Sequence, residues 1–126
     1  MFEAFEIGKD YTREQIHVVC GGNKQAFLPT KNGRVVAACL RPDLNPLAPE
    51  VILCNSGAAA RAAGRTLAKQ AEAIPVFIKR ETDRFRYVGS FAAAESMTAP
   101  ADCAPYARHT SFTTGQISRV IKLRRC

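Results

Sequence analysis

Three cationic side chains, Arg61, Arg65 and Lys69, stand four residues apart in an alanine-rich segment. Side chains at this spacing lie on one face of an α-helix, so the pattern predicts a cationic stripe along a helix over residues 56–72. Small residues occupy nearly the opposite face, which predicts that this face packs closely against a sheet. The stripe is suited to binding the phosphates of a nucleic acid. The alternative is a charged face that contacts only water.

The start of this helix adds further anion-binding groups. The first turn leaves backbone N–H groups without partners and carries the positive end of the helix dipole. We therefore predict that phosphates are bound by Asn55, Ser56, Arg61, Arg65 and Lys69. The segment from Gly57 to Thr66 is not a nucleotide-binding phosphate loop, because six residues separate its glycines instead of four and arginine replaces the lysine.

A second candidate site begins with the loop Arg41-Pro42-Asp43-Leu44-Asn45-Pro46, which its prolines stiffen. Rigid loops at the end of a sheet often hold ligand groups, and Asp43 and Asn45 carry polar groups suited to the edge of a base. The alternative for both residues is ordinary turn formation. We predict a base pocket formed by Gln25, Phe27, Asp43, Asn45 and Tyr87.

Other chemistry has little support in the sequence. The five cysteines are odd in number and no two have the C-x-x-C spacing, so we expect free thiols and no metal. Asp102, Cys103 and His109 lie near one another in sequence, but no motif of a nucleophilic enzyme surrounds them. We therefore predict no catalytic residue and no cofactor.

The charge of the chain is unevenly distributed. The net charge is +7, and residues 1–50 are neutral, with six basic and six acidic side chains. Residues 51–126 hold twelve basic and five acidic side chains, so they carry the whole excess. Such a one-sided excess attracts polyanions, of which nucleic acid is the commonest. The alternative is that the basic surface serves only solubility.

The composition is that of a folded protein: 47% of the 126 residues are hydrophobic and 23% are charged, which excludes a disordered or collagen-like chain. The length fits a single domain of residues 1–126. No apolar run is long enough to span a membrane, and the acidic N-terminus does not resemble a signal peptide. We expect no membrane partner and a cytoplasmic location.

The elements that position both candidate sites are predicted from turns and periodicity. A capping box at Thr12 and Gln15 starts a first helix, which ends at Gly21-Gly22. An Asn-Gly turn at 32–33 predicts a hairpin of strands 25–29 and 34–40. The remaining expected elements are strands 5–9, 51–54, 74–79, 84–91 and 116–123, with loops over 41–50 and 98–115. We expect an α+β fold: a small, partly closed antiparallel β-barrel with two packed helices, in which both hairpins share one curved sheet.

Several segments together resemble a known group of modules. They are residues 11–17, Gly21-Gly22, Gln25, Leu28-Pro29, residues 41–46, Ile74-Pro75-Val76-Phe77 and Tyr87-Val88-Gly89. This pattern, over most of residues 6–91, resembles small bacterial modules found alone or beside HNH nuclease domains in modification-dependent restriction. It is similar to the broader PUA-like group, which includes the SRA modules that read modified cytosine in DNA.

The resemblance implies a barrel that flips a base into a pocket while basic residues hold the phosphates. It favours DNA over RNA, a role in restriction and phage defence, and a separate nuclease partner, because this chain has no HNH motif. No pocket residue is carried over from it.

Three functions follow as hypotheses. The first is a nucleic-acid-binding module that recognises DNA with a modified or flipped base. The second is a base-acting enzyme of the same shape, similar to a DNA glycosylase, with Asp43 as its acid or base. The third is a protein-interaction adaptor that uses its basic face. Release of a free base separates the second from the first, and salt-dependent nucleic-acid binding separates both from the third.

Overall fold

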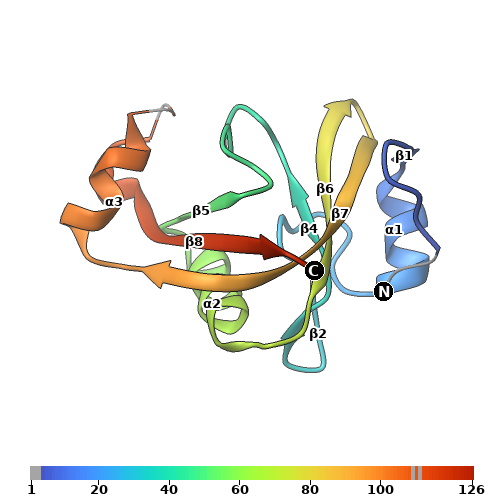
Figure 1. Ribbon diagram of the computed structural model, residues 1–126, viewed down its shortest axis with the longest axis horizontal. Coiled ribbons are helices and arrows are strands. Elements are labelled where there is room, and N and C mark those ends of the chain that lie inside the picture. The colour runs from blue at the N-terminus through green and yellow to red at the C-terminus, as the bar shows by residue number, and fades with distance from the viewer. Residues whose placement is uncertain (1–3, 109, 111) are drawn as a thin grey trace.

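The computed structural model describes residues 4–108, 110 and 112–126. Its main feature is a six-stranded sheet in the order β4-β6-β7-β8-β5, with the short β1 also paired to β7 (Figure 1). The strands are β1 (Asp10–Tyr11), β4 (Ala38–Leu40), β5 (Val51–Asn55), β6 (Ile74–Glu81), β7 (Arg84–Met97) and β8 (Ile117–Arg125). The β4–β6 pair is parallel and the other pairs of this sheet are antiparallel.

Strand β7 connects the two halves of this sheet. Its first half pairs with β6 up to Phe91, and its second half, from Phe91 to Met97, pairs with β8. Register shifts interrupt both ladders, and such bulges bend a strand and increase its twist. Gly89 adopts a φ of +126°, which L-residues rarely take. The result is a bent, open sheet with β4 and β5 at its edges, and no closed barrel forms among the described strands.

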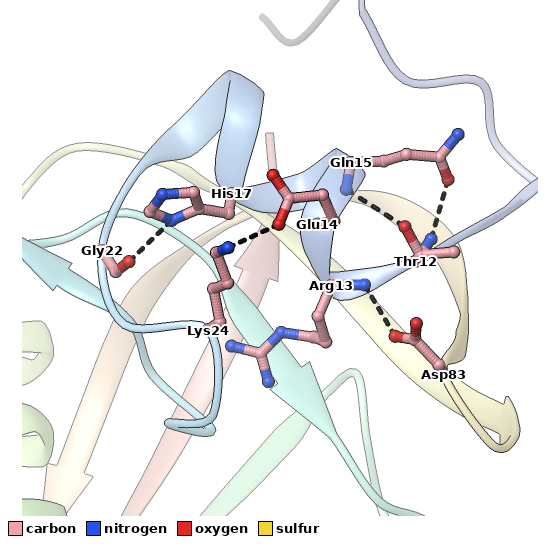
Figure 2. Close-up of polar contacts among 8 residues, drawn as sticks. All are labelled: Thr12, Arg13, Glu14, Gln15, His17, Gly22, Lys24 and Asp83. Atoms are coloured by element: carbon pink, nitrogen blue, oxygen red, sulfur yellow. Dashed lines mark hydrogen bonds and ion pairs between the residues drawn. The ribbon is translucent and has the colours of Figure 1, made fainter.

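Three α-helices lie in the described part of the chain: α1 (Arg13–Cys20), α2 (Ala58–Lys69) and α3 (Pro100–Ala107). A 3-10 turn, η1 (Thr114–Gln116), precedes β8, and a separate small sheet consists of β2 (Thr30–Lys31) and β3 (Arg34–Val35). The predicted capping box of α1 is confirmed: Gln15 N–H donates to Thr12 Oγ1, and Gln15 Oε1 accepts from Thr12 N–H (Figure 2). The helix ends at Gly21, as predicted.

Side chains of the sheet form three apolar clusters. The central cluster lies between the sheet and α2 and includes Ile52, Cys54, Leu67 and Ile121. A second cluster joins α1 to the β6–β7 hairpin through Ile16 and the aromatic rings of Phe5, Phe77, Phe85 and Tyr87. The third holds α3 against β5 and β8 through Cys103 and Ala107. Each helix therefore covers its own part of the bent sheet.

The first predicted hairpin differs from the structure. The Asn-Gly turn forms as expected, with positive φ at Asn32 and Gly33, but its strands are only two residues long. Pro29 has no N–H to extend the ladder, so residues 25–29 are not a strand. Residues 38–40 instead join the main sheet parallel to β6, and the prediction that both hairpins share one sheet is wrong.

Two further predictions need correction. The expected loop over 98–115 contains α3, because Pro100 suits the first turn of a helix and Cys103 and Ala107 become buried against the sheet. The expected strand over 5–9 is not present: Gly8 and Lys9 make backbone hydrogen bonds with Tyr87 of β7, but strand β1 covers only Asp10–Tyr11. The α+β class is confirmed, with one more helix than predicted.

Candidate nucleic-acid interface

A pocket of about 350 Å³ opens between the start of α1, the segment after it, the loop following β4, the end of β5 and the β6–β7 hairpin. These segments are far apart in sequence and the sheet brings them together. The described residues that line it are Arg13, Gln25, Phe27, Cys39, Arg41, Leu44, Asn45, Leu53, Asn55, Lys79, Phe85 and Phe112. The lining therefore combines cations, side-chain amides and aromatic rings, and none of these residues is an acid.

Arg13 holds one wall of this pocket in place. Its backbone N–H donates to Asp83 Oδ1 at 2.9 Å, which joins α1 to the β6–β7 turn (Figure 2). Its guanidinium donates to the carbonyl oxygens of Asn23 and Ala26 at 3.0 and 2.9 Å and lies 5.6 Å from the ring centre of Phe85. These bonds fix the segment that carries Gln25 and Phe27. The Nε atom of Arg13 is buried and has no partner among the described residues.

Asn45 is the most deeply buried polar side chain of the pocket, with 5% of its surface exposed. Its Oδ1 accepts a hydrogen bond from the backbone N–H of Leu53 at 2.7 Å, and the backbone N–H of Asn45 donates to the carbonyl of Arg41 at 2.8 Å. The loop after β4 is thereby tied to β5. A backbone N–H requires an acceptor, so the amide of Asn45 has only one possible orientation.

Asn55 connects the pocket with α2. It is the last residue of β5, and its Oδ1 accepts from the N–H of Gly57 at 2.8 Å. Gly57 is the N-cap of α2 and makes no side-chain cap, so neither Asn55 nor Ser56 caps the helix from the N-cap position. The hydroxyl of Ser118 donates to the Asn55 carbonyl at 2.7 Å, which fixes this end of β5. The start of α2 therefore lies beside the pocket.

The structure brings three of the five predicted base-pocket residues together: Gln25, Phe27 and Asn45. Asp43 is exposed and pairs with Arg41 at 3.0 Å instead of lining the pocket. Tyr87 is buried among the rings of the second cluster, where its hydroxyl lies 3.2 Å from Ser90 Oγ. Its place in the core follows from its position opposite Phe77 in the β6–β7 ladder.

Several lining residues were missed by sequence reasoning. Arg41 begins the same loop as Asn45, and Lys79 pairs with Phe85 beside the hairpin turn, so both could have been found by following the predicted loops. Arg13 lies between the two capping-box residues, Thr12 and Gln15. The capping box explains how the backbone starts the helix, but it gives no information about the Arg13 side chain. Phe112 reaches the pocket from a distant part of the chain, and no local pattern predicts that.

The predicted phosphate-binding face lies on the outside of α2. Arg61, Arg65 and Lys69 are exposed, and none pairs with an acidic side chain among the described residues. The inner face packs as predicted: a Cβ added at Gly64 would lie 2.8 Å from Cys54 Sγ, so only glycine permits this approach. Arg61 Nε donates to the Ser56 carbonyl at 2.8 Å, which holds this cation near the start of the helix. In Figure 1, α2 descends below β8 while the loop after β4 rises above it.

Three of the five thiols, those of Cys39, Cys54 and Cys103, are buried, whereas Cys20 is half-buried and Cys126 is exposed. Burial raises the pKa of Cys39, in the pocket lining, to about 12, and that of Cys54, beneath α2, also to about 12. Cys103 is buried in the third cluster while Asp102 is exposed, and His109 lies outside the described residues. No group of three metal-binding side chains occurs in the described part of the chain.

The model of the family DUF6697, a domain of unknown function, matches residues 10–104. The chain belongs to this family. The match includes nearly all of the pocket lining and the whole of α2, and among the lining residues only Phe112 lies beyond it. A comparison of the DUF6697 chain with curated proteins gives no match.

Two solved structures are similar to the DUF6697 chain. One is an SUVH5 SRA domain in complex with hemi-methylated CG DNA, with a TM-score of 0.65 and 12% identity over 96% of this chain and 88% of that one. The other is an SUVH5 SRA domain with methylated CHH DNA, with a TM-score of 0.63 and 12% identity over 97% and 89%. The DUF6697 chain therefore has an SRA-like fold. No described helix has the length and apolar character needed to cross a bilayer.

Proposed function

We propose that this DUF6697 domain is a DNA-binding module that accepts a single modified base, turned out of the double helix, into its pocket. The observation that carries the proposal is the pocket itself, which joins amides, aromatic rings and cations on an SRA-like fold. The similar SRA domains were solved as complexes with methylated DNA, which supports DNA as the partner.

The pocket has the properties that a flipped base requires. Its volume of about 350 Å³ falls at the lower end of the range for small-ligand sites. Side-chain amides such as those of Gln25 and Asn45 hydrogen-bond the edges of bases, and aromatic rings such as Phe27 contact their faces. Because Asn45 is fixed by Leu53, its contact with a base would cost little further ordering.

Phosphates on either side of the extruded base would meet the cations next to the pocket. Asn55, Ser56 and Arg61 lie at the start of α2 beside the pocket, and Arg65 and Lys69 follow at one-turn intervals along the helix. Each turn of an α-helix advances about 5.4 Å, so the distance from the pocket increases from Arg61 to Lys69. These contacts would give affinity without reading sequence.

The proposal is tested with a DNA duplex that carries 2-aminopurine next to the target base. Extrusion of the target unstacks the neighbour, so fluorescence should rise on binding, and the affinity should fall with salt at a log–log slope of about −0.9 per phosphate contact. Lys79→Gln, in the pocket lining, should weaken binding. Lys9→Gln is the matched control, because Lys9 is exposed and does not line the pocket. Salt-independent binding, or binding without a fluorescence change, would contradict the proposal.

In the cell, we propose that the domain acts in modification-dependent restriction and phage defence, in the cytoplasm, with a separate nuclease making the cut. The basis is the resemblance of residues 6–91 to modules with that role. Cells that carry the domain together with such a nuclease should reduce the plating of phages with modified DNA, and equal plating of all phages would contradict this role.

A further inference from the structure

The polar side-chain atoms that remain available in the pocket are almost all hydrogen-bond donors. Asn45 uses its Oδ1 to accept from Leu53 N–H, and its Nδ2 has no partner among the described residues. Asn55 uses its Oδ1 to accept from Gly57 N–H, which likewise leaves its Nδ2. Neither amide can be reversed, because a backbone N–H must meet an oxygen. Both amides therefore offer N–H groups to a ligand.

Two charged side chains and one thiol add to this excess. Arg13 lines the pocket and contributes its positive charge, while its Nε is buried without a partner in the described structure. Lys79 lines the pocket and forms no ion pair with a described residue, whereas Arg41 is paired with Asp43. Cys39 is 3% exposed and its raised pKa keeps it a neutral thiol, which is itself a weak donor.

Acceptors are scarce on the same wall. Among the described lining side chains there is no carboxylate, and the only side-chain carbonyl without a hydrogen-bond partner belongs to Gln25, which is exposed. The ring atoms of a methylated base can accept from only some of these donors, and its methyl group accepts no hydrogen bond; buried donors that stay unmet weaken binding. An oxygen-bearing or anionic substituent would satisfy more of them and gain from the charges of Arg13 and Lys79.

We propose that the pocket prefers a base with a substituent that carries acceptor oxygens, a formyl or carboxyl group, over a methylated base. This inference rests on the proposed function and specifies the ligand of the same pocket. The acceptor oxygens of the substituent take hydrogen bonds from Asn45 Nδ2 and from the cationic side chains, while the ring contacts the aromatic lining. The negatively charged carboxyl group binds more tightly than the neutral formyl group, because charge-assisted hydrogen bonds are stronger.

The test uses four duplexes that differ only at C5 of one central cytosine, which carries hydrogen, methyl, formyl or carboxyl. Affinities are measured by fluorescence anisotropy at one fixed salt concentration. The carboxyl duplex should bind about tenfold more tightly than the methyl duplex, with the formyl duplex between them. Equal or tighter binding of the methyl duplex would overturn the inference and leave the proposed function standing. Failure to bind any of the four would overturn the proposed function as well.

Two substitutions separate the pocket from general charge effects. Asn45→Asp keeps the oxygen that accepts from Leu53 N–H and replaces the donor with a negative acceptor, so the advantage of the carboxyl duplex should disappear. Asn55→Asp makes the same change at an exposed site where an acidic residue suits the start of α2, so it tests the inference even if Asn45→Asp fails to fold. It should reduce the advantage several-fold.

Asn32→Asp is the matched control, because this exposed turn residue has a φ of 54°, which aspartate tolerates, and it does not line the pocket. The control should retain the full preference for carboxyl. If Asn32→Asp removes the preference as strongly as the other two, the effect belongs to net charge and the inference is wrong.

Discussion

The pocket and the outer face of α2 differ in how they are built. The pocket is assembled from segments between Arg13 and Phe112, and the amides of Asn45 and Asn55 are held by hydrogen bonds from backbone N–H groups. The face of α2 comes from one continuous segment, and its three cations are exposed and unpaired within the described structure. Fixed groups can discriminate between ligands of similar shape, whereas exposed surface cations attract any phosphate.

Asn55 lies where these two regions meet. It lines the pocket and its side chain accepts from the N–H of the residue that begins α2. A base in the pocket and a phosphate at the helix start would thus be held by neighbouring parts of one chain segment. The comparison predicts a division: variants in the pocket change preference among bases, and variants of α2 change affinity for all DNA alike.

The largest expected effect comes from replacing Arg61, Arg65 and Lys69 together with glutamine. Binding should weaken by about 10- to 100-fold for modified and plain DNA alike, and the salt slope should become less steep by up to about 2.7. The thermal midpoint should stay the same, because the three side chains are exposed and glutamine has a similar helix propensity. Anisotropy titrations at several salt concentrations, beside a thermal melt, measure both quantities.

Single substitutions sharpen the same prediction. The loss should decrease from Arg61→Gln through Arg65→Gln to Lys69→Gln, because α2 leads away from the pocket. If the triple variant melts normally and binds as well as the original, the face of α2 only contacts water. The phosphate site would then lie at Arg41 and Lys79 in the pocket lining.

Asn45→Ala tests whether the pocket amide also holds the fold. The variant leaves the buried N–H of Leu53 without its acceptor, so the free energy of unfolding should fall by about 1–3 kcal/mol. Asn55→Ala is the matched control: its side chain is exposed, and its loss should cost less than about 0.5 kcal/mol. Urea denaturation of both variants measures the difference, and equal stability would show that the Asn45 bond contributes nothing.

The sequence is informative wherever a local rule decides the structure. The capping box at Thr12, the Asn-Gly turn at 32–33 and the small inner face around Gly64 all form as predicted. Each depends on residues within a few positions of one another. The same holds for the β6–β7 hairpin, where the buried Phe85 and Tyr87 alternate with less buried residues along the first part of β7.

The elements that were mispredicted depend on distant contacts. Residues 38–40 pair in parallel with β6, and α3 forms because Cys103 and Ala107 are buried against β5 and β8. Local composition carries neither fact. The pocket shows the same division: Asn45 was found because its loop looks polar and rigid, while Phe112 enters the lining only through the tertiary fold. Tyr87 was misplaced because an aromatic residue suits a core as well as a base.

Gly64→Ala should destabilise the protein although alanine is the better helix former. The added Cβ would lie 2.8 Å from Cys54 Sγ, and such overpacking costs about 1–3 kcal/mol, more than the gain in helix propensity of up to about 1 kcal/mol. The net loss should be about 1 kcal/mol. Cys54→Ala makes room for the new methyl group. Gly64→Ala should therefore stabilise the protein when it is introduced into the Cys54→Ala variant. A thermal melt of the four proteins decides this, and an unaltered midpoint in Gly64→Ala would contradict the close approach of α2.

The smallest expected effect is a difference in alkylation rate between two thiols with the same pKa, Cys39 in the pocket and Cys54 beneath α2. Burial raises the pKa of both Cys39 and Cys54 to about 12, so at pH 9 both are almost entirely neutral and their reactive thiolate fraction rises about tenfold per pH unit. Any difference in their alkylation by iodoacetamide must therefore come from access. Cys39 lines the pocket and Cys54 lies beneath α2, so Cys39 should react several-fold faster, as followed by mass spectrometry. Saturating DNA that carries the target base should slow Cys39 and leave Cys54 unaffected. If both thiols react at one rate and DNA protects neither, the pocket does not admit the base, and the distinction between a discriminating pocket and a uniform cationic face fails.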